Sequence, residues 1–87
     1  MRDQDDAAKE AYDLRMQHIR NACEKTILAL KNENQLQEHL TTEVATDILW
    51  TMLSIPTWEQ YRFQCGWTAQ ECILRTQLNA KAVLLKP

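Results

Sequence analysis

The segment from Ala69 to Leu85 carries apolar residues on two sides of a predicted helix, and this feature restricts the fold most. Successive helical residues turn by roughly 100°, which separates the apolar residues into two sets. The sets are Ile73, Ala80, Val83 and Leu84 on one side, and Leu74, Leu78, Ala82 and Leu85 on the other. A surface helix needs only one apolar stripe against its core. We therefore expect the chain's own core to cover one side and a second copy of the chain to cover the other.

Turn-forming residues are scarce, since 87 residues contain one Gly and two Pro. This composition speaks against a β-sandwich or barrel, and the length allows one domain. We predict a single all-α domain over residues 1–87, a four-helix array of one long helix, two shorter helices and one terminal helix. With a second copy covering the terminal helix, two such arrays form an intersubunit helix bundle.

Apolar spacing predicts the long first helix at about residues 4–32. One face of this helix carries Tyr12, Met16, Ile19, Cys23, Ile27 and Leu30. The second helix is expected to begin at a cap formed by Thr41 or Thr42, with Glu43 in its first turn. It ends before Pro56, because the residue that precedes a proline avoids the α region.

Pro56 is expected as the first residue of the short third helix, and Gly66 is expected to end that helix in the left-handed conformation. Thr68 and Glu71 have the spacing of a capping box, which predicts the start of the terminal helix at Ala69.

Charge and composition exclude several classes of protein. The net charge of −2 gives no basic excess for a nucleic-acid surface, and no apolar run reaches the length of about 18 residues that a membrane span needs. A charged N-terminus argues against a secretory signal, so we expect a cytoplasmic protein. Cys23, Cys65 and Cys72 have no zinc-site spacing and are expected to be reduced and buried as small hydrophobic residues. We expect no metal and no cofactor.

No catalytic pattern is found, and we expect a protein that is not an enzyme. The single glycine cannot build a phosphate-binding loop, and neither His18 nor His39 belongs to a metal-binding or catalytic motif. The aromatic residues are concentrated between residues 50 and 67, where packing at a helix corner is the favoured interpretation. The alternative is a ligand pocket lined by Tyr12, Met16, Trp50 and Trp58.

Three short motifs follow one another between Leu40 and Leu85. Residues 42–54 (TEVATDILWTMLS) hold a Leu-Trp pair, residues 56–61 (PTWEQY) hold a proline followed by aromatic residues, and residues 66–68 are Gly-Trp-Thr. In this order and spacing the motifs resemble the C-terminal end of the TetR family of bacterial transcriptional regulators. The final leucine pair is similar to the one that often closes those chains.

The resemblance implies a homodimer. In the TetR family the two corresponding helices pack against their copies to form an intersubunit four-helix bundle, which here assigns pairing to residues 42–54 and 69–85. The expected interface residues, shared in an undecided way between the chain's own core and its partner, are Leu49, Met52, Leu53, Ile73, Leu74, Leu78, Val83 and Leu84. The family's helix-turn-helix domain has no counterpart in these residues, so we expect no nucleic-acid binding by this chain alone.

The leading hypothesis is therefore a dimerisation and effector-sensing module of a TetR-like regulator, with a small apolar molecule as the effector. Two alternatives stay open. The first is a small-molecule-binding helical bundle, and the second is a truncated adaptor that forms mixed dimers with a full-length regulator.

Overall fold

The structure is a computed structural model, which describes the backbone of residues 2–87 and the side chains of residues 6–87. The elements, in chain order, are α1 (Arg2–Asn32), α2 (Thr42–Met52), α3 (Ile55–Glu59), the π-helical turn η1 (Gln60–Gln64) and α4 (Ala69–Leu84). The all-α fold expected from the sequence is confirmed. No helix within the described residues is both long and apolar enough to cross a membrane.

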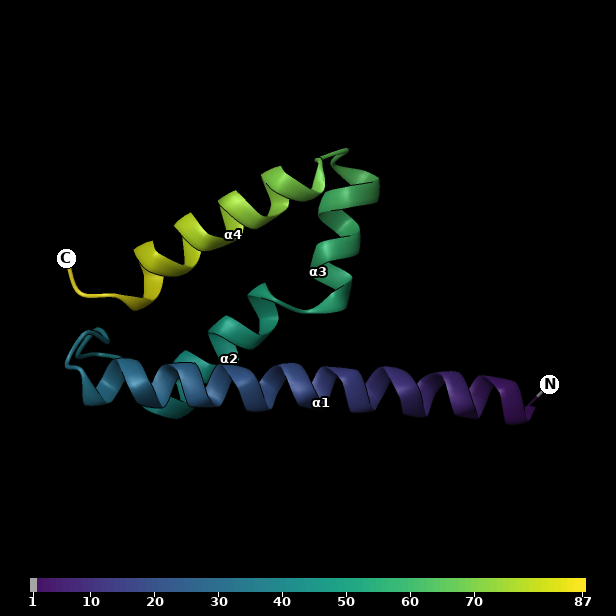
Figure 1. The fold of residues 1–87 in the computed structure, drawn as a ribbon, viewed down its shortest axis with the longest axis horizontal. Helices are drawn as coiled ribbons and strands as arrows, with labels where there is room; N and C mark the ends of the chain where they lie inside the picture. The colour runs from purple at the N-terminus through teal and green to yellow at the C-terminus, as the bar shows by residue number, and fades with distance from the viewer. Residues whose placement is uncertain (1) are drawn as a thin grey trace.

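The molecule is elongated and open on one side (Figure 1). α2 lies along the C-terminal half of α1, α3 leads away from that pair, and α4 returns toward the end of α1. The Cα radius of gyration is 15.1 Å, and the principal extents are 50 × 27 × 17 Å. A compact chain of this length would have a radius of gyration of about 12 Å. Much of the surface that a globule would bury is therefore exposed.

The core lies between α2 and the C-terminal half of α1. Cys23 and Ile27 are buried there, whereas Tyr12, on the same face of α1, is 38% exposed. Burial declines toward the N-terminus because α2 covers only one half of α1 (Figure 1). The apolar stripe predicted for the first helix is therefore a core face over only part of its length.

α1 ends in a backbone arrangement that needs a left-handed residue. Asn34 has a φ of 60°. The N–H of Gln35 donates to the carbonyl of Leu30 over 2.9 Å, and the N–H of Asn34 donates to Lys31 over 3.0 Å. These are the two bonds of a Schellman motif, in which asparagine is the usual substitute for glycine. The polar segment expected to stop the first helix does so by this mechanism.

The C-terminal end of the chain is tied to the connection between α1 and α2. An antiparallel β-bridge pairs Leu36 with Leu85, and the N–H of Gln37 donates to the carbonyl of Leu84 over 2.9 Å. The ammonium of Lys86 donates to the Asn34 side chain over 2.9 Å. Leu36 and Leu84 are both buried, so the tie is apolar as well as hydrogen-bonded.

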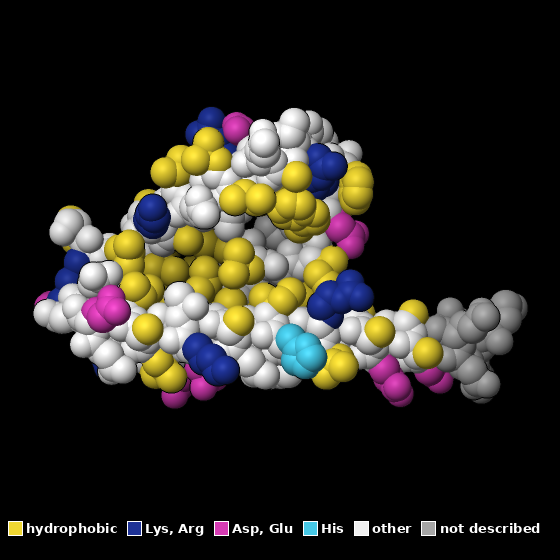
Figure 2. All heavy atoms as spheres, viewed as in Figure 1, with side chains coloured by type: hydrophobic (Ala, Val, Ile, Leu, Met, Phe, Trp, Pro, Cys, Tyr) yellow, Lys and Arg dark blue, Asp and Glu magenta, His cyan; other side chains and the backbone are white. Residues whose placement is uncertain are grey.

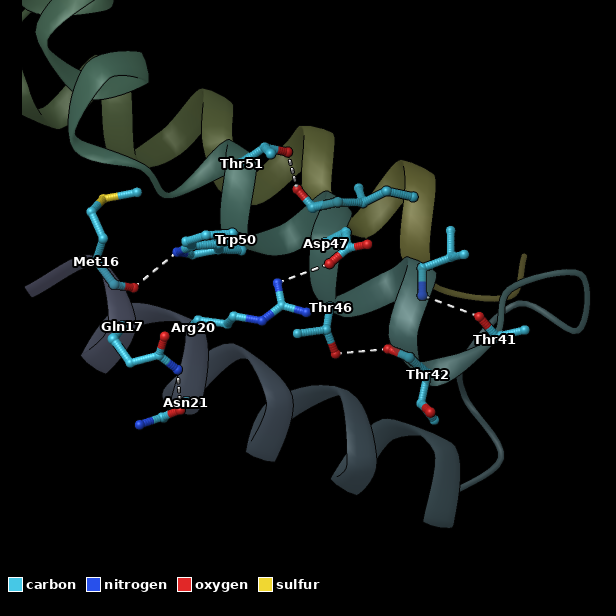
Figure 3. A network of polar contacts seen from close by, with 12 residues as sticks. Met16, Gln17, Arg20, Asn21, Thr41, Thr42, Thr46, Asp47, Trp50 and Thr51 are labelled. Carbon is cyan, nitrogen blue, oxygen red and sulfur yellow. Dashed lines mark hydrogen bonds and ion pairs between the residues drawn. The ribbon is translucent and has the colours of Figure 1, made fainter. Parts of the chain in front are cut away.

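A polar contact joins α1 to α2 beside the core (Figure 3). Arg20 Nη1 lies 2.8 Å from Asp47 Oδ1, and the guanidinium lies 4.9 Å from the centre of the Trp50 ring. The indole N–H of Trp50 donates to the carbonyl of Met16 over 2.9 Å. Exposed ion pairs contribute at most about 1 kcal/mol, so the partly buried Trp50 ring and the apolar core supply most of the stabilisation here.

Three side-chain caps begin the later helices. The hydroxyl oxygens of Thr41 and Thr68 accept from the backbone N–H three residues further on, each over 3.1 Å. Thr68 is the cap that the sequence predicted, and Thr41 is the cap of the two that the sequence left open. Ser54 caps α3, so Ile55 is its first residue and Pro56 its second. The prediction that Pro56 comes first was wrong by one residue, because the Ser54 hydroxyl caps the helix and Ile55 follows it directly.

Candidate functional site

The corner between η1 and α4 is fixed by aromatic stacking and backbone bonds. The rings of Tyr61 and Trp67 stack with centroids 4.4 Å apart and planes 7° from parallel. Arg62 Nη1 donates to the carbonyl of Trp67 over 2.8 Å, and the N–H of Trp67 donates to Tyr61 over 3.0 Å. Gly66, with a φ of 73°, reverses the chain in the left-handed conformation that the sequence predicted. This corner determines where α4 begins.

α4 turns one face toward the rest of the chain. Cys72 is buried on this face, and Thr76 and Ala80 are partly buried at the same helical spacing. Leu74 and Leu78, on a different side, are 47% and 48% exposed. Because residues four apart lie one above the other on a helix, Leu74 and Leu78 form one continuous stripe, which we call the outer stripe.

The residues expected at a dimer interface fall into three groups. Leu49 and Leu84 are buried in the chain's own core. Met52, Leu53 and Ile73 line a pocket. The remaining residues, which are about half exposed on α4, are Leu74, Leu78 and Val83.

The pocket lies where α2, α3, η1 and α4 meet and has a volume of about 220 Å³. Its apolar wall is formed by Met52, Leu53, Trp58, Tyr61 and Ile73. Thr76 and Gln77 of α4 supply the polar side chains, and none of the lining residues is charged. An uncharged lining admits neutral molecules, because nothing in it compensates the desolvation of an ion.

Of the four residues proposed for a ligand pocket from the sequence, only Trp58 lines this one. Trp50 and Met16 meet at the α1–α2 contact instead, and Tyr12 lies further along α1. Aromatic identity selected Trp58 correctly but also selected Trp50 and Tyr12, so it did not identify the pocket by itself. The contribution of Ile73 depends on how α4 is placed by the preceding corner, which local sequence does not reveal.

The exposed surface is large for the length of the chain. The accessible area is 6618 Å². A folded monomer of this size would expose roughly 5,300 Å². The excess over a compact monomer is therefore about 1,300 Å² for the whole chain. Figure 2 shows hydrophobic side chains lining the hollow between α4 and α1.

Among the described residues, one thiol has a shifted pKa. Burial raises the pKa of the Cys23 thiol, and the nearby Arg20 only partly opposes this shift. A raised pKa leaves less of the nucleophilic thiolate at neutral pH. Cys72 is buried as well, whereas Cys65 is exposed, which contradicts the expectation that all three cysteines are buried. Within residues 6–87, no three His, Cys, Asp or Glu side chains are grouped closely enough to hold a metal ion.

Comparison of the chain with protein-family models, with curated proteins and with solved structures gave no match in any of the three.

Proposed function

We propose that this chain is the dimerisation module of a TetR-like transcriptional regulator and that two copies pair through the outer stripe of α4. The single observation that carries the proposal is the half-exposed pair Leu74 and Leu78 on a helix whose other face already packs against its own chain. The motif order between residues 42 and 68 supports the family, since it resembles that of the TetR C-terminal helices.

A dimer formed through the outer stripe would cover part of the excess surface. A stable twofold interface buries roughly 1,600 Å² in total, or about 800 Å² on each copy. The excess of about 1,300 Å² is that of the whole chain, and the open side of α4 is one part of it. In a twofold contact the same patch serves both partners, so one apolar stripe is enough to make the interface.

Charged residues lie beside the outer stripe on α4 and limit the extent of its apolar surface. Arg75 Nε lies 3.1 Å from Glu71 Oε1, one helical turn before it, and both charged groups keep access to solvent. An apolar centre with a polar rim is the usual anatomy of a protein interface.

The role of such a dimer is mechanical. In a whole regulator of this type, a rigid dimer sets the separation of two DNA-reading domains, which must match the spacing of two half-sites. A ligand that favours one dimer geometry over another shifts the population between DNA-competent and incompetent states. The chain described here would supply the pairing and not the DNA contact.

The test is the molar mass in solution, measured by sedimentation equilibrium over a micromolar to submillimolar range. The wild-type chain is expected as a dimer. The double variant Leu74→Glu/Leu78→Glu is expected as a monomer, because each copy would bury two unpaired carboxylates at the interface. We expect the dissociation constant to rise by about 100-fold or more, which corresponds to about 2.7 kcal/mol.

Leu14→Glu is the matched control, since Leu14 is 59% exposed and lies on α1. It should leave the mass unchanged. Circular dichroism confirms that each variant keeps its helices. A wild-type chain that stays monomeric at the highest concentration would refute the proposal, and so would a double variant that dimerises as well as the control.

A further inference from the structure

The pocket between α2, α3, η1 and α4 has a volume that can be compared with those of known ligand sites. Its volume is about 220 Å³. An apolar cavity of about 150 Å³ accepts benzene, whereas pockets for drug-sized ligands begin at about 300 Å³. The volume therefore suits a molecule of one or two fused rings.

The lining favours a flat, uncharged aromatic molecule. Trp58 and Tyr61 offer aromatic rings, which pack favourably against another ring in stacked or edge-to-face geometry. The thioether of Met52 adapts to irregular shapes and contacts aromatic edges favourably. Thr76 and Gln77 provide a hydroxyl and an amide on one side only, which suits a ligand with a single hydrogen-bonding group.

The walls of the pocket are held in place before any ligand arrives. Tyr61 is fixed by its stacking on Trp67, and Trp58 lies in a helix that Ser54 caps. A π-helical turn at Gln60–Gln64, closed by the N–H of Cys65 donating to Gln60 over 3.0 Å, carries Tyr61. π-Helical turns are rare and occur often at functional sites. A preformed pocket costs less ordering free energy when it is filled.

We propose that this pocket binds neutral aromatic molecules of one or two rings that carry one hydrogen-bonding group. The site is distinct from the outer stripe, because Ile73 and Gln77 project from a side of α4 that is turned by roughly 100° from Leu74 and Leu78. Binding at the pocket does not require the dimer, so this proposal and the preceding one stand or fall separately.

The experiment is a titration with indole, followed by the methyl NMR signals of Met52, Leu53 and Ile73 in carbon-13-labelled protein. Indole has two fused rings and one N–H donor, whereas indoleacetate has the same rings and a negative charge. We expect indole to shift the three methyl signals with one saturating curve, and indoleacetate to bind about tenfold more weakly or worse because its carboxylate finds no partner.

Ile73→Trp fills the pocket, and its indole affinity is expected to fall by about tenfold or more. Leu14→Trp introduces the same side chain at a similarly exposed position on α1 and should bind indole as the wild type does. The wild-type titration stands by itself if Ile73→Trp fails to fold.

Three results would overturn the proposal. They are the absence of a saturating shift, shifts confined to signals outside the pocket, and intermolecular contacts that place a side chain of a second copy in the pocket. Equal binding of indole and indoleacetate would overturn the part that specifies a neutral ligand.

Discussion

The α1–α2 half of the molecule buries its apolar residues within the chain, whereas the α3–η1–α4 half leaves many of them exposed. Ile27 is fully buried between α1 and α2, but Ile73 on α4 is 52% exposed. Both residues belong to helices that the apolar spacing of the sequence predicts. What differs is coverage, because α1 and α2 lie against each other while α4 faces a hollow on one side and solvent on another (Figures 1 and 2).

This difference suggests that the two halves have different roles: the first stabilises the fold, and the second offers surface for interaction. The α1–α2 half contains the apolar core that stabilises the fold. The indole N–H of Trp50 is hydrogen-bonded there to the carbonyl of Met16. The other half is held at its corner by stacking and by helix caps, which position α4 without covering it. Surface that is positioned but not covered is suited to contact with other molecules.

The largest expected difference between the halves is in the free energy of unfolding that is lost when a buried or exposed isoleucine is truncated. Ile27→Ala should lower the free energy of unfolding by about 2–5 kcal/mol, because it leaves a cavity in packed surroundings. Ile73→Ala removes the same atoms at a half-exposed position and should cost about 1 kcal/mol or less. Urea denaturation at one protein concentration, followed by circular dichroism, measures both. Equal losses would show that α4 is as well packed as the core.

The reactivity of the thiols gives a second comparison between the halves, since each half contains one buried cysteine. Cys65 is exposed and should be alkylated first. Cys23 in α1 and Cys72 in α4 should react slower by on the order of 100-fold, because each waits for local opening. The raised pKa of Cys23 further lowers its thiolate fraction at neutral pH. Mass spectrometry of iodoacetamide-treated protein identifies the order. If Cys72 reacted as fast as Cys65, α4 would not be docked on α2.

Trp50→Phe tests the contact between α1 and α2. The phenyl ring keeps much of the packing but loses the N–H that donates to Met16 and weakens the attraction of Arg20 to the ring. We expect a loss of about 1–2 kcal/mol. Trp58→Phe is the matched change in the other half, where the ring is partly exposed, and thermal unfolding should separate the two variants. A smaller loss of stability in Trp50→Phe than in Trp58→Phe would contradict the view that the α1–α2 half is the better packed of the two.

The smallest effect is expected from the helix caps. Thr41→Ala and Thr68→Ala remove equivalent hydroxyl bonds, each worth about 1 kcal/mol. At α2 the loss should appear in global stability, because α2 is part of the core. At α4 it should appear mainly as faster hydrogen exchange of the first amides of the helix, such as that of Cys72. Equal global losses with no local exchange would mean that both helices unfold as one unit.

Local chemistry predicted the helices well. Thr41, Gly66 and Thr68 occupy the cap and turn positions expected of them, because a hydroxyl cap or a left-handed glycine is determined by neighbouring backbone groups. The π-helical turn at Gln60–Gln64 was missed, since the helical spacing of apolar residues does not distinguish one π-turn from a turn of α-helix. The start of α3 was predicted one residue late, since only two residues separate Met52 from Ile55 and the cap is the second of them, Ser54.

The interface and pocket residues were less predictable because their environment is tertiary. Periodicity placed Leu74 and Leu84 in two apolar sets of the terminal helix, and the structure gives them different exposures by tying the end of α4 to the connection after α1. Trp50 and Trp58 are similar in sequence context, yet one contacts α1 and the other lines the pocket. Pairing of two copies remains a proposal that the molar mass tests.

The tie between Leu36 and Leu85 has a mechanical consequence for α4. With the Tyr61–Trp67 stack near one end and this tie at the other, α4 is a strut fixed at both terminals. Held at both ends, α4 has a defined rotation about its axis, so neighbouring residues such as Ile73 and Leu74 keep a fixed angle to each other. The pocket and the outer stripe therefore share one helix whose orientation is set outside both of them.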